Sequence, residues 1–301
     1  MKANDIATIV LSYRAQSNVI GAVRSLLEQG EPTGIVVVNS GGGSVRNVLR
    51  AEGIEVPCLD YRERLFAGGA RNRGIAETSA RYVAFLAADC RARPGWIQHR
   101  LAAHGAGART VASAIVNSAP QSRVASAAHL GMFMRRLPRL PAEKTIRFGA
   151  SYERSLFDEF GLFDETLRSG EDTEFLERLP APLRPVWDGR IQTEHLNETR
   201  LLSLLRDQFC RGVRYGKERQ QVFGARRIKI AKEILRQPSL ALEFARQGLE
   251  ADELATVLEA MPILRAALLA RATGALLSGL LPSDLGTGRA TDCRESLHDN
   301  P

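Results

Sequence analysis

Two groups of acidic side chains have positions in which they could do chemistry. Asp89 follows the apolar run 82–87, and the adjacent Glu171 and Asp172 open an expected helix. A carboxylate at the end of a strand can hold Mg²⁺ or Mn²⁺, and a carboxylate beside a bound hydroxyl can remove its proton. Both groups also have an ordinary explanation, because Asp and Glu are common at helix N-termini. Sequence position alone leaves both explanations open.

The elements that position these acids alternate between strand and helix. Continuous apolar runs predict strands, and apolar residues at helical spacing predict the helices between them. The expected strands are 7–11, 35–38, 56–59, 82–87 and 110–116, and the expected helices are 17–30, 45–49, 68–77 and 171–179. This order predicts a parallel sheet covered by helices on both faces, with ligands bound beyond the carboxyl ends of its strands.

Three polar segments follow these strands and are candidates for binding a ligand. They are Ser12-Tyr13-Arg14, Asn39 to Ser44, and Ala87 to Cys90. Gly41-Gly42-Gly43 permits positive φ and a close approach of the backbone to a ligand. It is not a Walker loop, because no Gly-Lys-Ser/Thr follows, and it lacks the glycine spacing of a dinucleotide site. A flexible turn is the alternative explanation.

The pattern is less regular after residue 90. We expect a helix whose first residue is Pro94, a surface excursion over 118–141, and only helices from Asn197 onward. The chain is therefore divided into a first domain over 1–196, a helical region over 197–285 and a flexible tail over 286–301.

The positive charge is concentrated in one segment. The net charge is +7, and residues 206–236 contain ten Lys or Arg against three Asp or Glu, which accounts for the whole excess. A local anionic partner is therefore favoured over general coating of nucleic acid. Few aromatic residues are interleaved with these cations, so stacking on bases is poorly supported. The segment suits an anionic membrane surface or a diphosphate-lipid acceptor, and a solvated basic face is the simpler alternative.

Composition excludes several other classes of protein. A hydrophobic content of 44% excludes a fully disordered chain. The four cysteines lie far apart without a CxxC pair, which suits a reducing cytoplasm rather than a disulfide framework or a zinc ribbon. No uninterrupted apolar stretch reaches the roughly 18 residues of a spanning helix. We expect a cytoplasmic protein that could contact the inner face of the membrane.

Five short segments, taken in chain order, together resemble the family-2 glycosyltransferases. They are Val10-Leu11-Ser12-Tyr13-Arg14, Val36 to Gly41, Gly69 to Gly74, Phe85 to Cys90 and Gly170-Glu171-Asp172. The resemblance covers about residues 6 to 200. It implies the type A glycosyltransferase (GT-A) fold, a Rossmann-like mixed sheet with helices on both faces. It also implies transfer of a sugar from a nucleotide-diphosphate donor, usually with inversion.

The resemblance assigns a metal site to Asp89. The family motif is Asp-x-Asp, and this chain has Ala87-Ala88-Asp89, which keeps the second Asp, the metal ligand of the family. The first Asp typically helps to hold the ribose or sugar of the donor, and Ala87 stands in its place. His195 follows an expected strand where many relatives place a histidine on the metal or the diphosphate. One imidazole beside one carboxylate would suit Mn²⁺, and a structural role is the alternative for a lone histidine.

The resemblance also assigns the acids and the donor site. Asp172 would be the general base and Glu171 its neighbour or a ligand of the acceptor, at a helix N-terminus whose dipole favours ionised carboxylates. The expected donor-binding residues are Ser12, Tyr13, Arg14, Asn39, Arg71, Asn72 and Ala87. Asn39 stands where relatives commonly carry an Asp that accepts from the uracil N–H, so a uridine donor is expected but not fixed.

The resulting hypothesis is a metal-assisted, inverting glycosyltransferase of polysaccharide biosynthesis. It would use Mg²⁺ or Mn²⁺, a nucleotide-sugar donor, and a saccharide or lipid-linked acceptor. One alternative is a catalytically silent nucleotide-sugar-binding protein, because Ala87 and Asn39 depart from the family pattern. A second is a module that binds RNA or an anionic surface through residues 206–236.

Overall fold

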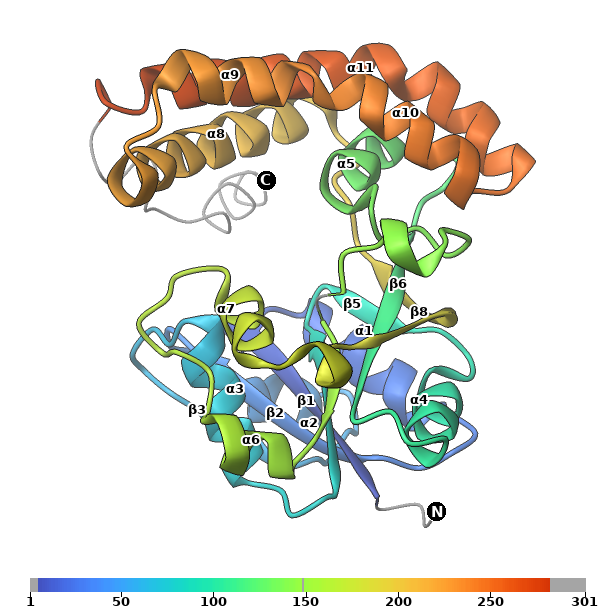
Figure 1. Cartoon of the computed structure of the whole chain (residues 1–301). Helices are drawn as coiled ribbons and strands as arrows, with labels where there is room; N and C mark the ends of the chain where they lie inside the picture. The colour runs from blue at the N-terminus through green and yellow to red at the C-terminus, as the bar shows by residue number, and fades with distance from the viewer. Residues whose placement is uncertain (1–4, 148, 282–301) are drawn as a thin grey trace. The chain divides into compact units, whose positions relative to one another are not determined.

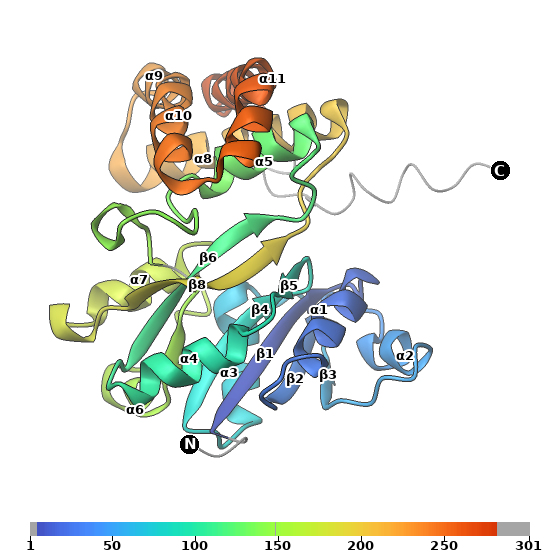
Figure 2. The ribbon, with the colours of Figure 1, turned by 90° about the vertical axis from the view of Figure 1, so that its right-hand side faces the viewer.

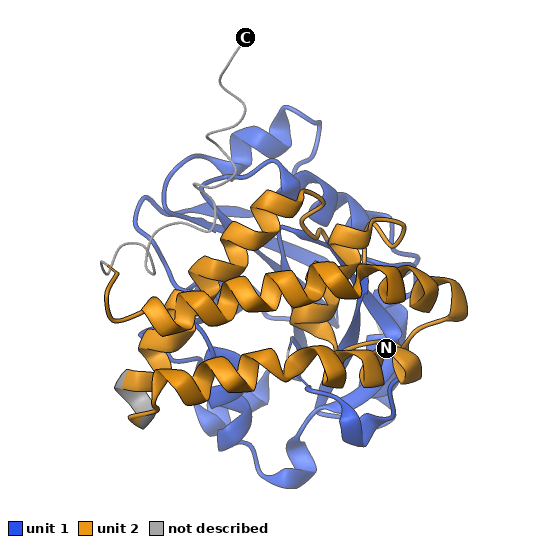
Figure 3. Cartoon of the chain, turned by 90° about the horizontal axis from the view of Figure 1, so that it is seen from above, with its two compact units in different colours: residues 1–116, 140–195 blue, residues 117–139, 196–301 orange. Residues whose placement is uncertain are grey.

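The computed structural model describes residues 5–147 and 149–281, which form two compact units. The first, here called the sheet unit, comprises 1–116 and 140–195, and the second, the helical unit, comprises 117–139 and 196–301. Figure 3 shows the two units in different colours. The expected tail, 286–301, lies outside the described residues.

One mixed sheet organises the sheet unit. Its strands lie in the order β3-β2-β1-β4-β7-β6-β8-β5 (Figures 1 and 2). They are β1 (Ile6–Tyr13), β2 (Gly34–Ser40), β3 (Cys58–Asp60), β4 (Tyr82–Ala87), β5 (Cys90–Ala92), β6 (Thr110–Asn117), β7 (Ser151–Glu153) and β8 (Val186–His195). Strands β3, β2, β1 and β4 are parallel, whereas β7 is antiparallel to β4 and β6, and β5 is antiparallel to β8.

Helices cover both faces of this sheet, as the sequence predicts. They are α1 (Asn18–Leu27), α2 (Val45–Arg50), α3 (Ala67–Ala76), α4 (Trp96–Gly105), α6 (Ser155–Phe160) and α7 (Glu171–Arg178). Side chains alternate along β1, so that Ile6 and Val10 pack with α1, α2 and α4, whereas Ile9 packs with α3, α6 and α7. Because both faces are buried, the strands read as continuous apolar runs. The expected start at Pro94 is wrong, since α4 begins at Trp96 after Gly95, which has a left-handed conformation.

The helical unit contains α5 (Arg123–Phe133), α8 (Leu201–Phe223), α9 (Arg227–Leu235), α10 (Gln237–Gly248) and α11 (Ala251–Leu277). The prediction of a surface excursion over 118–141 is wrong, because the helix α5 lies within it and buries residues 125–130. Its buried residues form one consecutive run with a single large apolar side chain, that of Leu130, so no helical period of large apolar residues marks it. No helix within 5–147 and 149–281 has both the length and the apolar character needed to cross a membrane.

Backbone contacts hold α8 against α11. A Cβ atom added at Gly274 would lie 2.2 Å from the carbonyl oxygen of Phe209, and one added at Gly212 would meet the carbonyl oxygen of Arg271. We expect Gly274→Ala to lower the free energy of unfolding by roughly 3 kcal/mol, at the upper end of overpacking costs, because backbone cannot yield as a side chain can. Chemical denaturation measures this loss. Gly131→Ala on α5 is the control, since its new Cβ would meet only the flexible end of Leu264 at 3.3 Å and should change stability little.

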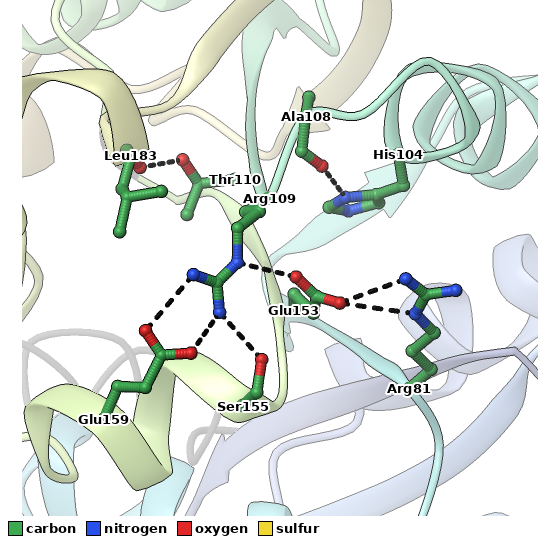
Figure 4. A network of polar contacts seen from close by, with 9 residues as sticks. All are labelled: Arg81, His104, Ala108, Arg109, Thr110, Glu153, Ser155, Glu159 and Leu183. Carbon is green, nitrogen blue, oxygen red and sulfur yellow. Dashed lines mark hydrogen bonds and ion pairs between the residues drawn. The ribbon is translucent and has the colours of Figure 1, made fainter.

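Polar networks anchor β7 in the centre of the sheet. Figure 4 shows Glu153 between Arg109 and Arg81, with Nε of Arg109 donating to its carboxylate over 2.7 Å. Burial raises the pKa of Glu153, but the hydrogen bonds from the two arginines outweigh this effect and lower it. The same strand holds Ser151, whose hydroxyl contacts Nε2 of His104 at 2.9 Å. These contacts fix the strand that lies beside β4.

The buried His104 predicts how stability depends on pH. Its Nδ1 donates to the carbonyl of Ala108, and burial lowers its pKa to about 4. An unfolded histidine binds a proton below pH of about 6.5, so the free energy of unfolding should fall as the pH drops from about 6.5 to 4, by up to about 3 kcal/mol. Urea unfolding at pH 7 and pH 4.5 should show a smaller pH-dependent loss in His104→Gln than in the unchanged chain. Equal losses would contradict this assignment.

Candidate active site

A carboxylate, an imidazole and a thiol meet at one edge of the sheet unit. Asp89 lies between β4 and β5, and His195 is the last residue of β8. Nε2 of His195 lies 3.6 Å from Oδ2 of Asp89, and the Asp89 side chain is 38% exposed. The structure therefore brings together the two residues that the sequence analysis placed at a metal.

Cys90 is a third possible metal ligand, a role that was not expected from the sequence. Its Sγ lies 3.7 Å from Oδ1 of Asp89, and the ligand atoms of Asp89, Cys90 and His195 all lie within 4.8 Å of one another. Antiparallel pairing of β5 with β8 places Cys90 directly opposite His195. The sequence gives no sign of this pairing, since β5 is too short to be recognised from a pattern of three residues.

The donor atoms in this cluster fit a divalent cation. Metal–ligand bonds of 2.0–2.3 Å put neighbouring ligand atoms about 3–4 Å apart, which is near the shorter separations in the cluster. Oxygen, nitrogen and sulfur together suit borderline metals such as Co²⁺ or Zn²⁺, and the carboxylate also suits Mn²⁺. Because Asp89 is partly exposed, an ion bound there would remain accessible to a ligand from solution.

The two acids of α7 have different environments. Glu171 is 5% exposed, and its Oε1 lies 2.7 Å from a terminal nitrogen of Arg71. Asp172 is only partly buried, and its Oδ1 accepts from the backbone N–H of Thr173 over 2.9 Å. Gly170, with φ of 86°, makes the turn that starts the helix. Asp172 is therefore the acid that a ligand can reach, whereas Glu171 is held by an ion pair.

Arg71 connects this helix to the sheet. Its guanidinium lies 5.1 Å from the ring centres of both Phe85 on β4 and Phe163. Ala87, the exposed last residue of β4, projects from the same face of the strand as Phe85, because side chains alternate. The acids of α7 and the carboxyl end of β4 thus belong to one side of the sheet. Arg71 was expected at a diphosphate, and here it pairs with Glu171.

Asn72 braces the approach to α7. It is buried, and its side chain accepts from the backbone N–H of Phe163 and donates to the carbonyl of the same residue. Its amide also donates to Glu165 over 3.0 Å. Its contact with a donor stays a prediction, since these bonds assign it a positioning role.

A single buried amide organises the loops after β1 and β2. Oδ1 of Asn39 accepts from the backbone N–H of Ala15 over 2.8 Å, and its Nδ2 donates to Asp60 over 3.0 Å and to the carbonyl of Gly42 over 3.2 Å. Asn39 is fully buried, so its expected contact with a base stays a prediction. Asp60, which also accepts from the N–H of Val45, was missed, although it directly follows an expected strand.

Tyr13 lies among arginines at the end of β1. The guanidinium carbons of Arg14 and Arg64 lie 5.3 Å and 5.4 Å from its ring centre. Burial lowers the pKa of Arg168, and the nearby charge of Arg64 lowers it further, whereas Tyr13 raises it. Tyr13 and Arg14 were expected here from the sequence, whereas Arg64 and Arg168 were not, because they come from loops without a motif. This group of cations could attract an anion such as a diphosphate.

Ser12, the last of the expected donor-binding residues, is buried near the end of β1. It is 6% exposed, and its hydroxyl has no hydrogen-bond partner among the described residues. Gly41, with φ of 82°, packs against Tyr13, and a Cβ at this glycine would lie 2.4 Å from Cε2 of the ring. Only glycine fits here, so the first glycine of the expected loop fixes the position of Tyr13.

The sheet order, the helices on both faces and the acids beside the carboxyl end of β4 define a GT-A fold. The family model described as "Glycosyl transferase family 2" matches residues 8–161. The chain therefore belongs to glycosyl transferase family 2. It is similar to the succinoglycan biosynthesis protein ExoO of Rhizobium meliloti (strain 1021), with 32% identity over 197 residues, 57% of this chain and 54% of ExoO. The chain thus spans about half the length of this relative.

Two solved structures share the fold. The mannosyltransferase PcManGT from Pyrobaculum calidifontis, in complex with GDP-Man and Mn²⁺, has a TM-score of 0.53 at 16% identity, over 90% of this chain and 87% of that chain. TarS 1–349 of S. aureus, in complex with UDP-GlcNAc, has a TM-score of 0.50 at 14% identity, over 86% of this chain and 72% of that chain. At these identities the likeness concerns the fold alone.

Proposed function

We propose that the chain transfers a sugar from a nucleotide-diphosphate donor to a hydroxyl of a saccharide or lipid-linked acceptor, with inversion. The observation that carries this proposal is the convergence of Asp89 and His195, whose side chains lie 3.6 Å apart at the carboxyl end of the sheet. In this proposal the two residues hold Mg²⁺ or Mn²⁺. The bound cation would neutralise charge on the departing diphosphate.

The protein's own residues supply the remaining chemistry. Asp172 removes the proton of the acceptor hydroxyl as that oxygen attacks the anomeric carbon, and its partial exposure supports this role. Glu171 and Arg71 hold the start of α7 in place through their ion pair. Because an ion pair of low exposure keeps one geometry, Asp172 stays oriented toward the substrate.

The donor would bind where β1 and β2 end. Tyr13 offers a ring for the base, and Arg14, Arg64 and Arg168 offer positive charge for the diphosphate. The complexes of two structural relatives, one with GDP-Man and one with UDP-GlcNAc, support a nucleotide-sugar without choosing its base. We favour UDP, on the position of Asn39 in the sequence.

The division of labour along the chain is also part of the proposal. Residues 1–196 would carry out the transfer, and residues 197–285 would present basic residues to an anionic acceptor or membrane. Exposed Ile228 on α9 and exposed Leu280 after α11 support an interfacial role, since cations and apolar side chains together favour a membrane surface. The likeness to ExoO supports a place in polysaccharide biosynthesis.

A thermal-shift panel of UDP-, GDP- and dTDP-sugars, each with and without Mn²⁺, tests this function. We expect one nucleotide to raise the melting temperature, with a larger shift when Mn²⁺ is present. Asp89→Asn should remove the metal-dependent part, whereas Asp158→Asn, at an exposed position on α6, should not. Failure of every nucleotide to stabilise the protein would refute the proposal. Binding without nucleotide release to any acceptor would indicate a catalytically silent binder.

A further inference from the structure

Cys90 is the residue at this site whose chemistry the proposed function leaves unused. It is 7% exposed and packs against the apolar cluster of α1, α2 and α4, which alone would explain a buried cysteine. Its sulfur, however, lies beside the carboxylate of Asp89 and within 4.8 Å of a ring nitrogen of His195. A thiol that serves only to pack the core need not lie beside two side chains of metal-binding type, so its place here suggests a second role.

The pairing of β5 with β8 fixes Cys90 in this position. Cys90 lies opposite His195, and Ala92 lies opposite Thr193. The indole Nε1 of Trp96 donates to the hydroxyl of Thr193 over 2.9 Å in the buried interior. On the exposed side Arg93 pairs with Glu194 at 2.9 Å. Because the register is held on both sides, the thiol and the imidazole stay on the same face of the two strands.

We propose that Cys90 is the third protein ligand of the cation held by Asp89 and His195, and that this thiolate makes the site prefer a transition-metal cation (Mn²⁺, Co²⁺ or Zn²⁺) over Mg²⁺. The inference rests on the metal site of the proposed function. Thiolate and imidazole prefer borderline cations, whereas Mg²⁺ prefers oxygen ligands and keeps its waters. On binding, the sulfur forms a bond to the cation and its proton passes to solvent. A site with Asp89 and His195 alone would lack this preference.

Titration of the full chain with Co²⁺, under a non-thiol reductant, tests the ligand directly. Coordination of a thiolate to Co²⁺ gives a charge-transfer absorption in the near ultraviolet, which carboxylate and imidazole ligands do not give. We expect this band to saturate at one Co²⁺ per chain. Cys90→Ser should abolish it and raise the Kd for Zn²⁺ by about 10–100-fold, the loss seen even for residues that only support a ligand, while the Kd for Mg²⁺ changes little.

The other cysteines provide matched controls. Cys58→Ser removes a buried thiol of the sheet unit, and Cys210→Ser removes a partly exposed one of the helical unit; both should keep the band. If Cys90→Ser does not fold, as judged by circular dichroism, a chain whose other three cysteines are all serine should still show the band.

Three results would overturn the proposal, and they separate it from the proposed function. A band that persists in Cys90→Ser would assign the thiolate elsewhere. Co²⁺ binding that depends on Asp89 but gives no band would exclude Cys90 as a ligand and leave the Asp89–His195 site intact. No binding of Co²⁺ or Zn²⁺ would refute this inference, whereas the Mn²⁺-dependent thermal shift with nucleotide-sugars tests the metal site of the proposed function separately.

Discussion

Replacing Asp172 by Asn is expected to lower kcat by about 10²–10⁴-fold while donor binding changes little. The amide keeps the shape of the side chain but cannot take a proton from the acceptor hydroxyl, and general-base catalysis contributes about that factor. The ion pair of Glu171 with Arg71 does not involve Asp172, so the start of α7 should stay folded. Release of nucleotide diphosphate in the presence of acceptor measures the rate, and a thermal shift with donor measures binding.

Glu177→Gln is the control for this prediction. Glu177 is exposed on the same helix, so its replacement removes a charge of the same kind without touching the site. It should retain nearly full activity. An Asp172→Asn enzyme as active as Glu177→Gln would show that another group takes the proton.

The second prediction concerns the buried ion pair beneath the site. Arg71→Met is expected to lower the free energy of unfolding by about 3–5 kcal/mol, because it leaves the carboxylate of Glu171 buried without its partner. The double variant Arg71→Met with Glu171→Leu should recover much of this loss, since no uncompensated charge remains. Urea denaturation of the single and double variants measures both values.

An exposed ion pair gives the contrast. Arg24 and Glu52 lie 2.6 Å apart with side chains 49% and 42% exposed, so Arg24→Met should cost less than about 1 kcal/mol. Equal losses from Arg71→Met and Arg24→Met would mean that burial does not set the strength of the first pair.

The double variant Arg71→Met with Glu171→Leu should also lose activity, because α7 would be less ordered without the ion pair. If the pair served stability alone, the double variant would keep its activity.

The parallel half of the sheet could be predicted because its strands are buried on both faces. Residues 7–11, 35–38 and 82–87 are continuous apolar runs, and each lies within a strand of the structure. The resemblance to family 2 then located Asp89 and the acids of α7. The helix α5 could not be recognised, because its buried residues are consecutive and only Leu130 among them is a large apolar residue, so they give no hydrophobic period.

Contacts between segments that are distant in the chain could not be predicted from the sequence. The pairing of β5 with β8 places Cys90 opposite His195, although the segment 91–194 separates these two residues in the chain. Likewise nothing local indicates that Arg71 pairs with Glu171, or that the amide of Asn39 is occupied by Ala15 and Asp60. Position in a motif predicted that Asp89 and His195 lie together, but not which partner each of the other residues takes.

The packing of α5 against α11 has a consequence for the order in which the protein folds during synthesis. The sheet unit is complete once β8 has left the ribosome, because its last residue is 195. Helix α5 emerges earlier but packs chiefly on α11, which is translated last among the described helices. During that interval α5 lacks its main partner, so a nascent chain would carry a finished sheet beside a helix still exposed to chaperones.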